Sequence, residues 1–332
     1  MPQFSVIVPV YNRPAEVEDL LASLAEQTYR DFETIIVEDG STLPCGYICD
    51  AYAGRLDLHY YPKSNEGRSI ARNYGIERAR GRMLVFFDSD CVIPPDYFEI
   101  LSQSLAEKPV DCFGGPDAAH ESFSPTQKAI NFAMTSFLTT GGIRGGRHSM
   151  EKFVPRSFNM GYTREVYDKV GGFREMFSED IDMSTRIRQA GFSTTLIPDA
   201  KVYHKRRVDF AKFWRQVHVF GMSRITLKEL YPGSLKIVHT LPAVATVIGL
   251  VLLLLGIFVS PWWLLPIGIY IAALFVAALC STESPEVACL AIPAAAIQIC
   301  GYGTGFIRAY INNILLRRGR NLQREIEMRR GK

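Results

Sequence analysis

The sequence predicts an α/β domain with a mostly parallel sheet, followed by C-terminal transmembrane helices. Two observations lead to this fold class. In the first hundred residues, short apolar runs of strand length alternate with segments whose apolar side chains recur at helical spacing. Residues 240–282 contain no charged side chain, and at about 1.5 Å of rise per residue they could cross a roughly 30 Å hydrocarbon core twice.

The first part of the chain contains predicted strands with helical segments between them. Val17, Leu20 and Leu24 recur at helical spacing behind Pro14, which suits the start of a helix. The strands are FSVIVPV, ETIIVED, LHYYP and RMLVFF, and the second helical segment is RSIARNYGIERA. This order of elements is typical of a parallel sheet, in which ligands bind beyond the carboxyl ends of the strands.

Polar residues follow three of these strands. They are Asn12 after Pro9 and Tyr11, then Asp39-Gly40-Ser41, and finally Asp88-Ser89-Asp90. Asp, Asn and Gly are also ordinary turn formers, so turn chemistry explains any one of these groups equally well. Taken together, they place polar side chains at the edge of the sheet where a ligand would bind.

The middle of the chain adds further strands, helices and a glycine-rich segment. TTGGIRGGRHS surrounds Arg144 with four glycines and predicts either a lid over a substrate or an exposed connection. SEDIDMSTRIRQAGF begins a helix at Ser178, with Glu179 and Asp180 in its first turn. STTLIPDAKVYH is a later strand that ends at His204, directly before a basic cluster.

The remaining third of the chain is assigned to the membrane. Residues 208–236 predict an amphipathic interfacial helix, although packing onto the domain would use the same apolar stripe. Residues 237–308 predict a transmembrane hairpin with SPWW as its far turn, followed by a third apolar segment. Pro293 and three glycines weaken this third segment as a simple span and favour a re-entrant or interfacial one. Residues 309–332 form a basic tail that suits an anionic cytoplasmic leaflet.

Composition excludes several classes of protein. The N-terminal residues lack the pattern of a signal peptide, so we expect residues 1–207 to stay in the cytoplasm. The chain's seven cysteines are scattered and fit reduced thiols, and Cys45 and Cys49 lack the second pair typical of a zinc site. No basic stripe with interleaved aromatics is found in the N-terminal part, which argues against nucleic acid as a partner.

The ordered motifs resemble those of family 2 glycosyltransferases, which have the GT-A fold, a Rossmann-like nucleotide-binding domain. The resemblance covers roughly residues 4–207. It is carried by VIVPVYNRP, VEDGST, NEGRSIARNYGIERARGRMLVFFDSD, NMGYTREVYDKVGGF, SEDIDMSTRIRQAGF and LIPDAKVYHKRR. It implies a nucleotide diphosphate sugar as the donor.

The chemistry of such a donor explains why carboxylates are needed. A divalent cation, Mg²⁺ or Mn²⁺, bridges the two phosphates, and such hard cations prefer carboxylate oxygens. The resemblance implies Asp90 and Asp88 as metal ligands, with Asp88 also reaching the nucleotide and His204 as a further ligand. It also implies a nucleotide cleft formed by Pro9, Tyr11 and Asp39, with Arg72 and Arg68 near the phosphates.

The resemblance implies Asp180, in the Glu179-Asp180 pair, as the catalytic base. A hydroxyl acceptor must lose a proton as it attacks, whereas a phosphate acceptor is already ionised. The pair therefore favours a hydroxyl of a lipid-linked glycan and an inverting, single displacement. Donor or acceptor specificity is assigned to the region of Asp117, Arg144 and Arg207.

Other functions stay open at this point. A polyprenyl-phosphate sugar synthase would share the membrane hairpin, and a nucleotidyltransferase or a non-catalytic nucleotide-sugar-binding membrane protein could share the cleft. A processive polysaccharide synthase is disfavoured, because the expected Gln-X-X-Arg-Trp motif is replaced by Phe213-Trp214-Arg215-Gln216. The predicted location is the inner (cytoplasmic) membrane, with several spans and the catalytic domain in the cytoplasm, and oligomers are possible.

Overall fold

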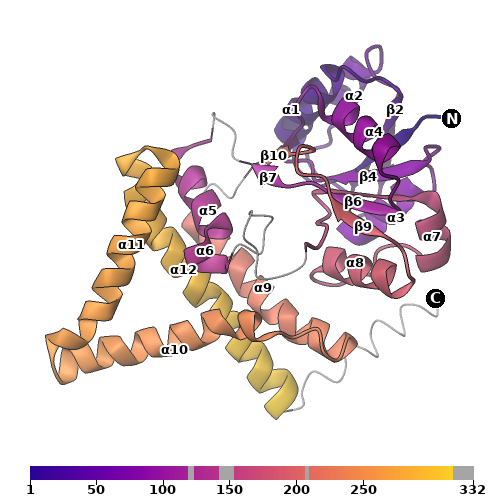
Figure 1. Cartoon of the computed structure of the whole chain (residues 1–332). Coiled ribbons are helices and arrows are strands. Elements are labelled where there is room, and N and C mark those ends of the chain that lie inside the picture. Colours follow the sequence, from indigo (N-terminus) through magenta and orange to yellow (C-terminus); the bar gives the residue numbers. More distant parts are fainter. Residues whose placement is uncertain (119–122, 142–152, 206–208, 317–332) are drawn as a thin grey trace. The chain divides into compact units, whose positions relative to one another are not determined.

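The computed structural model describes residues 1–118, 123–141, 153–205 and 209–316 of the chain. The chain forms two compact units (Figure 1). The N-terminal unit contains residues 1–120 and 153–205, and the helical unit contains residues 121–152 and 206–332. The helical unit therefore includes a segment that interrupts the N-terminal unit in the sequence.

A seven-stranded sheet forms the centre of the N-terminal unit, in the order β3-β2-β1-β4-β8-β6-β9. The pairs β1 with β2, β1 with β4, β2 with β3 and β6 with β9 are parallel, and only β8 pairs antiparallel with its neighbours β4 and β6 in the part of the sheet described. The mostly parallel α/β sheet predicted from the sequence is thus confirmed. The strands are β1 (Phe4–Val10), β2 (Phe32–Asp39), β3 (Leu58–Lys63), β4 (Met83–Phe87), β6 (Cys112–Gly114), β8 (Asn159–Thr163) and β9 (Thr194–Leu196).

Helices bury both faces of this sheet (Figure 1). Successive side chains along a strand point to opposite faces, so Val6 and Val8 of β1 belong to one apolar cluster and Ile7 to the other. The first cluster is completed by α1 (Pro14–Ala25), α2 (Gly46–Tyr52) and α4 (Tyr97–Glu107). The second is completed by α3 (Arg68–Ile76), α7 (Arg164–Val170) and α8 (Glu179–Gln189).

A small second sheet brings the end of the N-terminal unit back to the carboxyl end of β4. It has the order β5-β10-β7, with strands β5 (Cys91–Val92), β7 (Asp117–Ala118) and β10 (Val202–His204). In the antiparallel register, His204 of β10 lies opposite Cys91 of β5. This pairing places His204 beside Asp90, which directly precedes β5.

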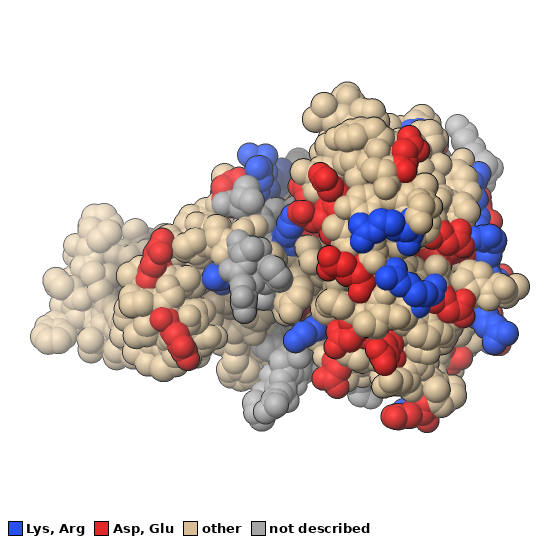
Figure 2. Space-filling model, turned by 90° about the horizontal axis from the view of Figure 1, so that it is seen from above, with Lys and Arg blue, Asp and Glu red and all other residues tan. Residues whose placement is uncertain are grey.

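The helical unit contains helices that are long and apolar enough to cross a membrane. Three candidate spans cover Ile237–Phe258, Pro261–Thr282 and Pro285–Leu315. Figure 1 shows α10, α11 and α12 as three sides of a triangle, and the left end of the surface in Figure 2 is almost entirely tan. The elements are α5 (Pro125–Thr135), α6 (Phe137–Thr140), α9 (Phe210–Leu230), α10 (Ile237–Phe258), η1 (Pro261–Leu264), α11 (Leu265–Thr282), α12 (Pro285–Ala309) and η2 (Tyr310–Leu315).

The third apolar segment forms one continuous helix, α12, despite the residues expected to interrupt it. Pro293 lies inside the helix. A Cβ atom on Gly305 would lie 2.0 Å from the carbonyl oxygen of His218 in α9, and one on Gly301 would lie 2.5 Å from Val217. These glycines, four residues apart, are therefore points of close contact between two helices rather than helix breakers.

The apolar stripe of α9 is covered by protein. Phe213 and Val217 are fully buried in a cluster with residues of α5, α11 and α12, whereas Trp214 stays 38% exposed. Part of the stripe therefore packs within the helical unit, while the interfacial helix expected for residues 208–236 stays a prediction.

Candidate active site

The candidate site lies beyond the carboxyl ends of β1, β2 and β4. At the end of β2, Asp39 is only 3% exposed and accepts hydrogen bonds from the backbone N–H groups of Glu66 and Gly67, at 3.0 and 2.8 Å. Lys63 Nζ lies 2.9 Å from the same carboxylate. Asp39 therefore fixes the loop between β3 and α3, and both of its oxygens already have partners.

Asp88 and Asp90 follow β4, and each has one oxygen bound to an arginine. Arg72 donates to Asp88 Oδ1 at 2.7 Å, and Arg13 donates to Asp90 Oδ2 at 2.5 Å. The other oxygen of each carboxylate faces His204: Nε2 lies 3.9 Å from Asp88 Oδ2 and 3.1 Å from Asp90 Oδ1. One oxygen of each carboxylate thus lies within 4 Å of the same imidazole nitrogen.

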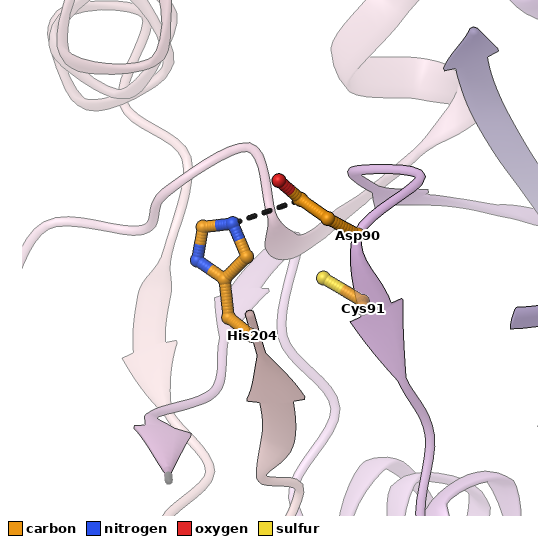
Figure 3. A group of neighbouring side chains, drawn as sticks. All are labelled: Asp90, Cys91 and His204. Atoms are coloured by element: carbon orange, nitrogen blue, oxygen red, sulfur yellow. Dashed lines mark hydrogen bonds and ion pairs between the residues drawn. The ribbon is translucent and has the colours of Figure 1, made fainter. Parts of the chain in front are cut away.

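This arrangement fits a divalent cation. Asp90, Cys91 and His204 present possible ligand atoms within 4.8 Å of one another (Figure 3). The ring of His204 is fixed by stacking on Phe158, with centroids 4.8 Å apart. Hard cations take carboxylate oxygens, often with an imidazole, so Asp88, Asp90 and His204 could hold Mg²⁺ or Mn²⁺.

Cys91 is less suited to this role than the two carboxylates. It is fully buried, and its thiol lies 3.6 Å from the carbonyl oxygen of Phe158. Burial raises the pKa of the Cys91 thiol well above its usual value, so the neutral S–H form is favoured, and a thiol is a soft ligand.

The ionised form of Asp90 is strongly favoured. Burial alone would raise the pKa of the Asp90 carboxyl, but the neighbouring His204 and Arg13 outweigh this effect and hold it well below its usual range. An ionised carboxylate with an oxygen directed at His204 is the form that a cation requires.

Arg72 joins the metal-ligand candidates to the start of α8. Its side chain is 1% exposed, and it donates to Glu179 Oε1 at 2.8 Å as well as to Asp88. Burial alone would lower the pKa of Arg72, but Asp88 and Glu179 outweigh it and raise the pKa. Arg68 donates to the other oxygen of Glu179 at 2.7 Å. Both arginines assigned to phosphates thus bind Glu179 in this structure.

Asp180 begins α8 beside this buried pair. Ser178 has a left-handed backbone conformation, with φ of 62°, which turns the chain into the helix. Asp180 Oδ1 accepts a hydrogen bond from the N–H of Ile181 at 2.8 Å, and Oδ2 lies 3.6 Å from Arg156. Its side chain is 17% exposed, so a solvent-borne acceptor could reach it.

The remaining predicted site residues lie in different surroundings. Tyr11 is 51% exposed and Pro9 is partly buried near the end of β1. Asp117 lies in β7 and pairs with Val202 of β10, in the same small sheet as His204. Arg144 and Arg207 lie outside the described residues.

Two arginines in the site were not predicted from the sequence. Arg13 and Arg156 contact carboxylates that are 77 and 24 positions away along the chain, so no local pattern reveals them. The only hint for Arg13 was its place directly after Asn12, in a turn that follows a strand. Asn12 itself accepts hydrogen bonds from the N–H groups of Thr42 and Leu43, which joins this turn to the one after β2.

Solved structures with the same fold include a mannosyltransferase. The chain aligns with PcManGT from Pyrobaculum calidifontis, a mannosyltransferase in complex with GDP-Man and Mn²⁺, at a TM-score of 0.56 and 19% identity, covering 94% of this chain and 87% of that one. At this identity the likeness shows the fold alone.

Curated relatives match mainly the N-terminal part. EpsJ, a glycosyltransferase of Bacillus subtilis, is 29% identical over 186 residues, which cover 54% of this chain and 53% of EpsJ. The glycosyltransferase GlyA of Streptococcus pneumoniae is 38% identical over 111 residues, covering 33% of this chain and 16% of GlyA. The chain therefore spans about half or less of the length of these relatives.

A mostly parallel sheet with carboxylates beyond its strand ends defines the class, an α/β protein with the GT-A type of fold. The family model described as "Glycosyl transferase family 2" matches residues 5–171, half of the 332-residue chain. The protein belongs to glycosyl transferase family 2. The resemblance inferred from the ordered motifs is thereby confirmed, while the roles of the individual residues stay predictions.

Proposed function

We propose that this protein is an inverting, metal-dependent glycosyltransferase. It moves a sugar from a nucleotide diphosphate sugar to a hydroxyl of a membrane-anchored glycan, in the synthesis of a cell-envelope polysaccharide or glycoconjugate. The position of Asp88 Oδ2 and Asp90 Oδ1, at 3.9 and 3.1 Å from His204 Nε2, carries this proposal. PcManGT, which shares the fold, was solved with GDP-Man and Mn²⁺, and a donor and a cation of these classes suit the site described here.

The donor would be held at the carboxyl ends of the strands. Asp88, Asp90 and His204 would hold a Mg²⁺ or Mn²⁺ ion, which would supply positive charge to stabilise the diphosphate that leaves. Arg72 is fully buried and holds Asp88 in place. Arg13, which is partly exposed, holds Asp90 in place. Pro9 and Tyr11 would line the nucleotide, and Asp39 would support it through the loop that it fixes.

Asp180 would take the proton from the acceptor hydroxyl. Glu179, its neighbour in sequence, is bound through Arg72 to Asp88, so the start of α8 is connected to the metal-ligand candidates. A carboxylate of this kind accepts the proton as the hydroxyl attacks the anomeric carbon, and a single displacement inverts that centre. A phosphate acceptor would not need it.

The helical unit would bind the membrane that contains the acceptor. Side chains on α10 and α11 such as Ile248, Ile257 and Ile269 are 53–69% exposed, and lipid would cover them. We place the N-terminal unit on the cytoplasmic side of the inner membrane, where nucleotide sugars are made, with α10 and α11 as the membrane-spanning hairpin.

The test uses the full chain purified in detergent, a panel of nucleotide sugars and a membrane lipid extract. We expect release of nucleoside diphosphate together with a glycan product of inverted configuration. Asp180→Asn should lower transfer by about 10²- to 10⁴-fold, the usual share of a general base. The exposed Asp199 offers a matched control, and Asp199→Asn should transfer at the wild-type rate.

Other outcomes separate the alternatives. A product carrying the sugar on polyprenyl phosphate, with normal activity in Asp180→Asn, would remove the hydroxyl acceptor and the base assignment. Conversion of the nucleotide sugar to sugar 1-phosphate and nucleoside triphosphate when pyrophosphate is added would indicate a nucleotidyltransferase. A donor that stays intact after long incubation, although it binds, would indicate a binding protein without turnover.

A further inference from the structure

The candidate site belongs to a row of side chains in which arginines, carboxylates and one histidine contact one another in turn. Each member contacts the next at 2.5–3.9 Å, from the surface through the buried centre and out again. In order, the row consists of Arg68, Glu179, Arg72, Asp88, His204, Asp90 and Arg13. Within the row itself, the three arginines and the three carboxylates carry equal and opposite charge.

A divalent cation disturbs this balance. Bound between Asp88, Asp90 and His204, it would add two positive charges next to carboxylates that already hold Arg72 and Arg13. Like charges a few ångströms apart in a partly buried site repel strongly. A diphosphate that arrives with the cation would offset the excess, because its oxygens carry the opposite charge.

The two arginines differ in their freedom to respond. Arg72 is 1% exposed and is shared between Asp88 and Glu179, so it is fixed on both sides. The Arg13 side chain is 33% exposed, and Asp90 is the one carboxylate within ion-pair distance of it among the described residues. Arg13 directly precedes α1, and Asn12 before it is fixed to the turn after β2, which keeps the Arg13 backbone at the rim of the site.

We propose that Arg13 couples the binding of the divalent cation to the binding of the diphosphate. Without ligands, its guanidinium neutralises Asp90 and opposes a cation that binds alone. When both ligands are present, the diphosphate compensates the added charge and accepts contacts from the exposed guanidinium. This inference rests on the proposed function, because it takes a nucleotide diphosphate as the ligand of the site.

The experiment measures the binding of Mn²⁺ by equilibrium dialysis with the full chain in detergent. Inorganic pyrophosphate serves as the diphosphate, and the protein-free chamber accounts for Mn²⁺ that pyrophosphate binds in solution. For the wild type, we expect pyrophosphate to tighten Mn²⁺ binding by at least about tenfold, within the range of typical coupling between sites. Arg13→Gln should bind Mn²⁺ alone about tenfold more tightly than the wild type and should lose most of the coupling.

Two further variants control this comparison. Arg13→Lys keeps the positive charge and should retain the coupling. Arg30 is exposed and no ion pair of it is found among the described residues, so Arg30→Gln changes the net charge equally and should behave as the wild type. Thermal melting of each variant reports folding independently of ligand binding.

The inference is overturned if Arg13→Gln weakens Mn²⁺ binding with and without pyrophosphate, since Arg13 would then only orient Asp90. Unchanged coupling in Arg13→Gln would overturn it too. Transfer of sugar by the wild type is a separate readout: coupling without transfer would contradict the proposed function and leave the inference standing.

Discussion

Two clusters of the N-terminal unit combine a histidine with carboxylates and nearby arginines in different arrangements. Glu33, Asp57 and His59 lie at the start of β2 and β3, and their ligand atoms are within 4.8 Å of one another, as in the group of Asp90, Cys91 and His204. The two clusters lie at opposite ends of the parallel strands. Groups of side chains that could bind a metal ion thus occur at both ends of the sheet.

The two clusters differ in where their arginines lie relative to the possible metal ligands. Arg80 contacts all three members of the first cluster: Nε lies 2.7 Å from Glu33, and Nη2 lies 2.7 Å from Asp57 and 2.9 Å from the ring of His59. In the candidate site the arginines bind the outer carboxylate oxygens, and no arginine among the described residues contacts His204. An arginine in the middle makes an ion-pair cluster that stabilises the fold, whereas arginines at the rim leave the inner ligand atoms available for a cation.

Among the comparisons between the two clusters, the largest expected effect comes from replacing one proposed metal ligand. Asp90→Asn should lower turnover of the nucleotide sugar by about 10²- to 10³-fold, because the charge that holds the cation is lost. Asp57→Asn is the matched change in the other cluster and should keep wild-type turnover. Steady-state rates of both variants make the comparison, and an equal loss in the two would contradict the distinction between the clusters.

The two histidines offer a second comparison. His204→Gln should weaken Mn²⁺ binding in the presence of pyrophosphate by at least about tenfold, since the imidazole that we propose as a metal ligand is replaced. His59→Gln should leave the Mn²⁺ affinity unchanged. Equilibrium dialysis gives both values, and Mn²⁺ binding that depends on His59 would place the metal at the wrong end of the sheet.

The smallest effect concerns stability and its pH dependence. Burial alone would raise the pKa of Glu33, but hydrogen bonds from Ser5 and Arg80 outweigh it and lower the pKa. Glu33→Gln should therefore cost about 1–3 kcal/mol at pH 7, because a buried hydrogen-bonded charge is removed.

Because its folded pKa is lowered, the Glu33 carboxylate contributes stability above its unfolded pKa, and this contribution is lost as the pH falls through the folded pKa. The difference in melting temperature between wild type and Glu33→Gln should accordingly shrink below about pH 4. A difference that grows on acidification would show that Glu33 is not stabilised as a carboxylate.

The features predicted correctly from the sequence are those that depend on short stretches of chain. Carboxylates after strand-like runs were expected at one edge of a parallel sheet, and Asp88, Asp90 and His204 do lie together there. The partners of these groups could not be predicted, because Arg13 and Asp90 meet only through the fold. Arg72 was expected to point at phosphates, but its contacts with Asp88 and Glu179 follow from the packing of α3 against α8.

The helical unit shows the same limit for glycines. Gly301 and Gly305 weakened the case for a continuous span, because glycine is unfavourable inside an isolated helix. In the structure, α9 lies so close that a Cβ on Gly305 would overlap the backbone of His218. These glycines weaken an isolated helix, but in the folded protein they form the surface on which α12 contacts α9.

Residues 121–152 belong to the helical unit but lie within the sequence of the N-terminal unit, which limits where the chain can be shortened. The chain passes between the two units three times, at residues 120–121, 152–153 and 205–206. Ala129, Ile130 and Met134 of α5 are buried in a cluster completed by α9, α11 and α12. A shortened chain that stops at residue 205 would keep α5 but lack the helices that cover it, so it would expose an apolar face and aggregate in aqueous buffer.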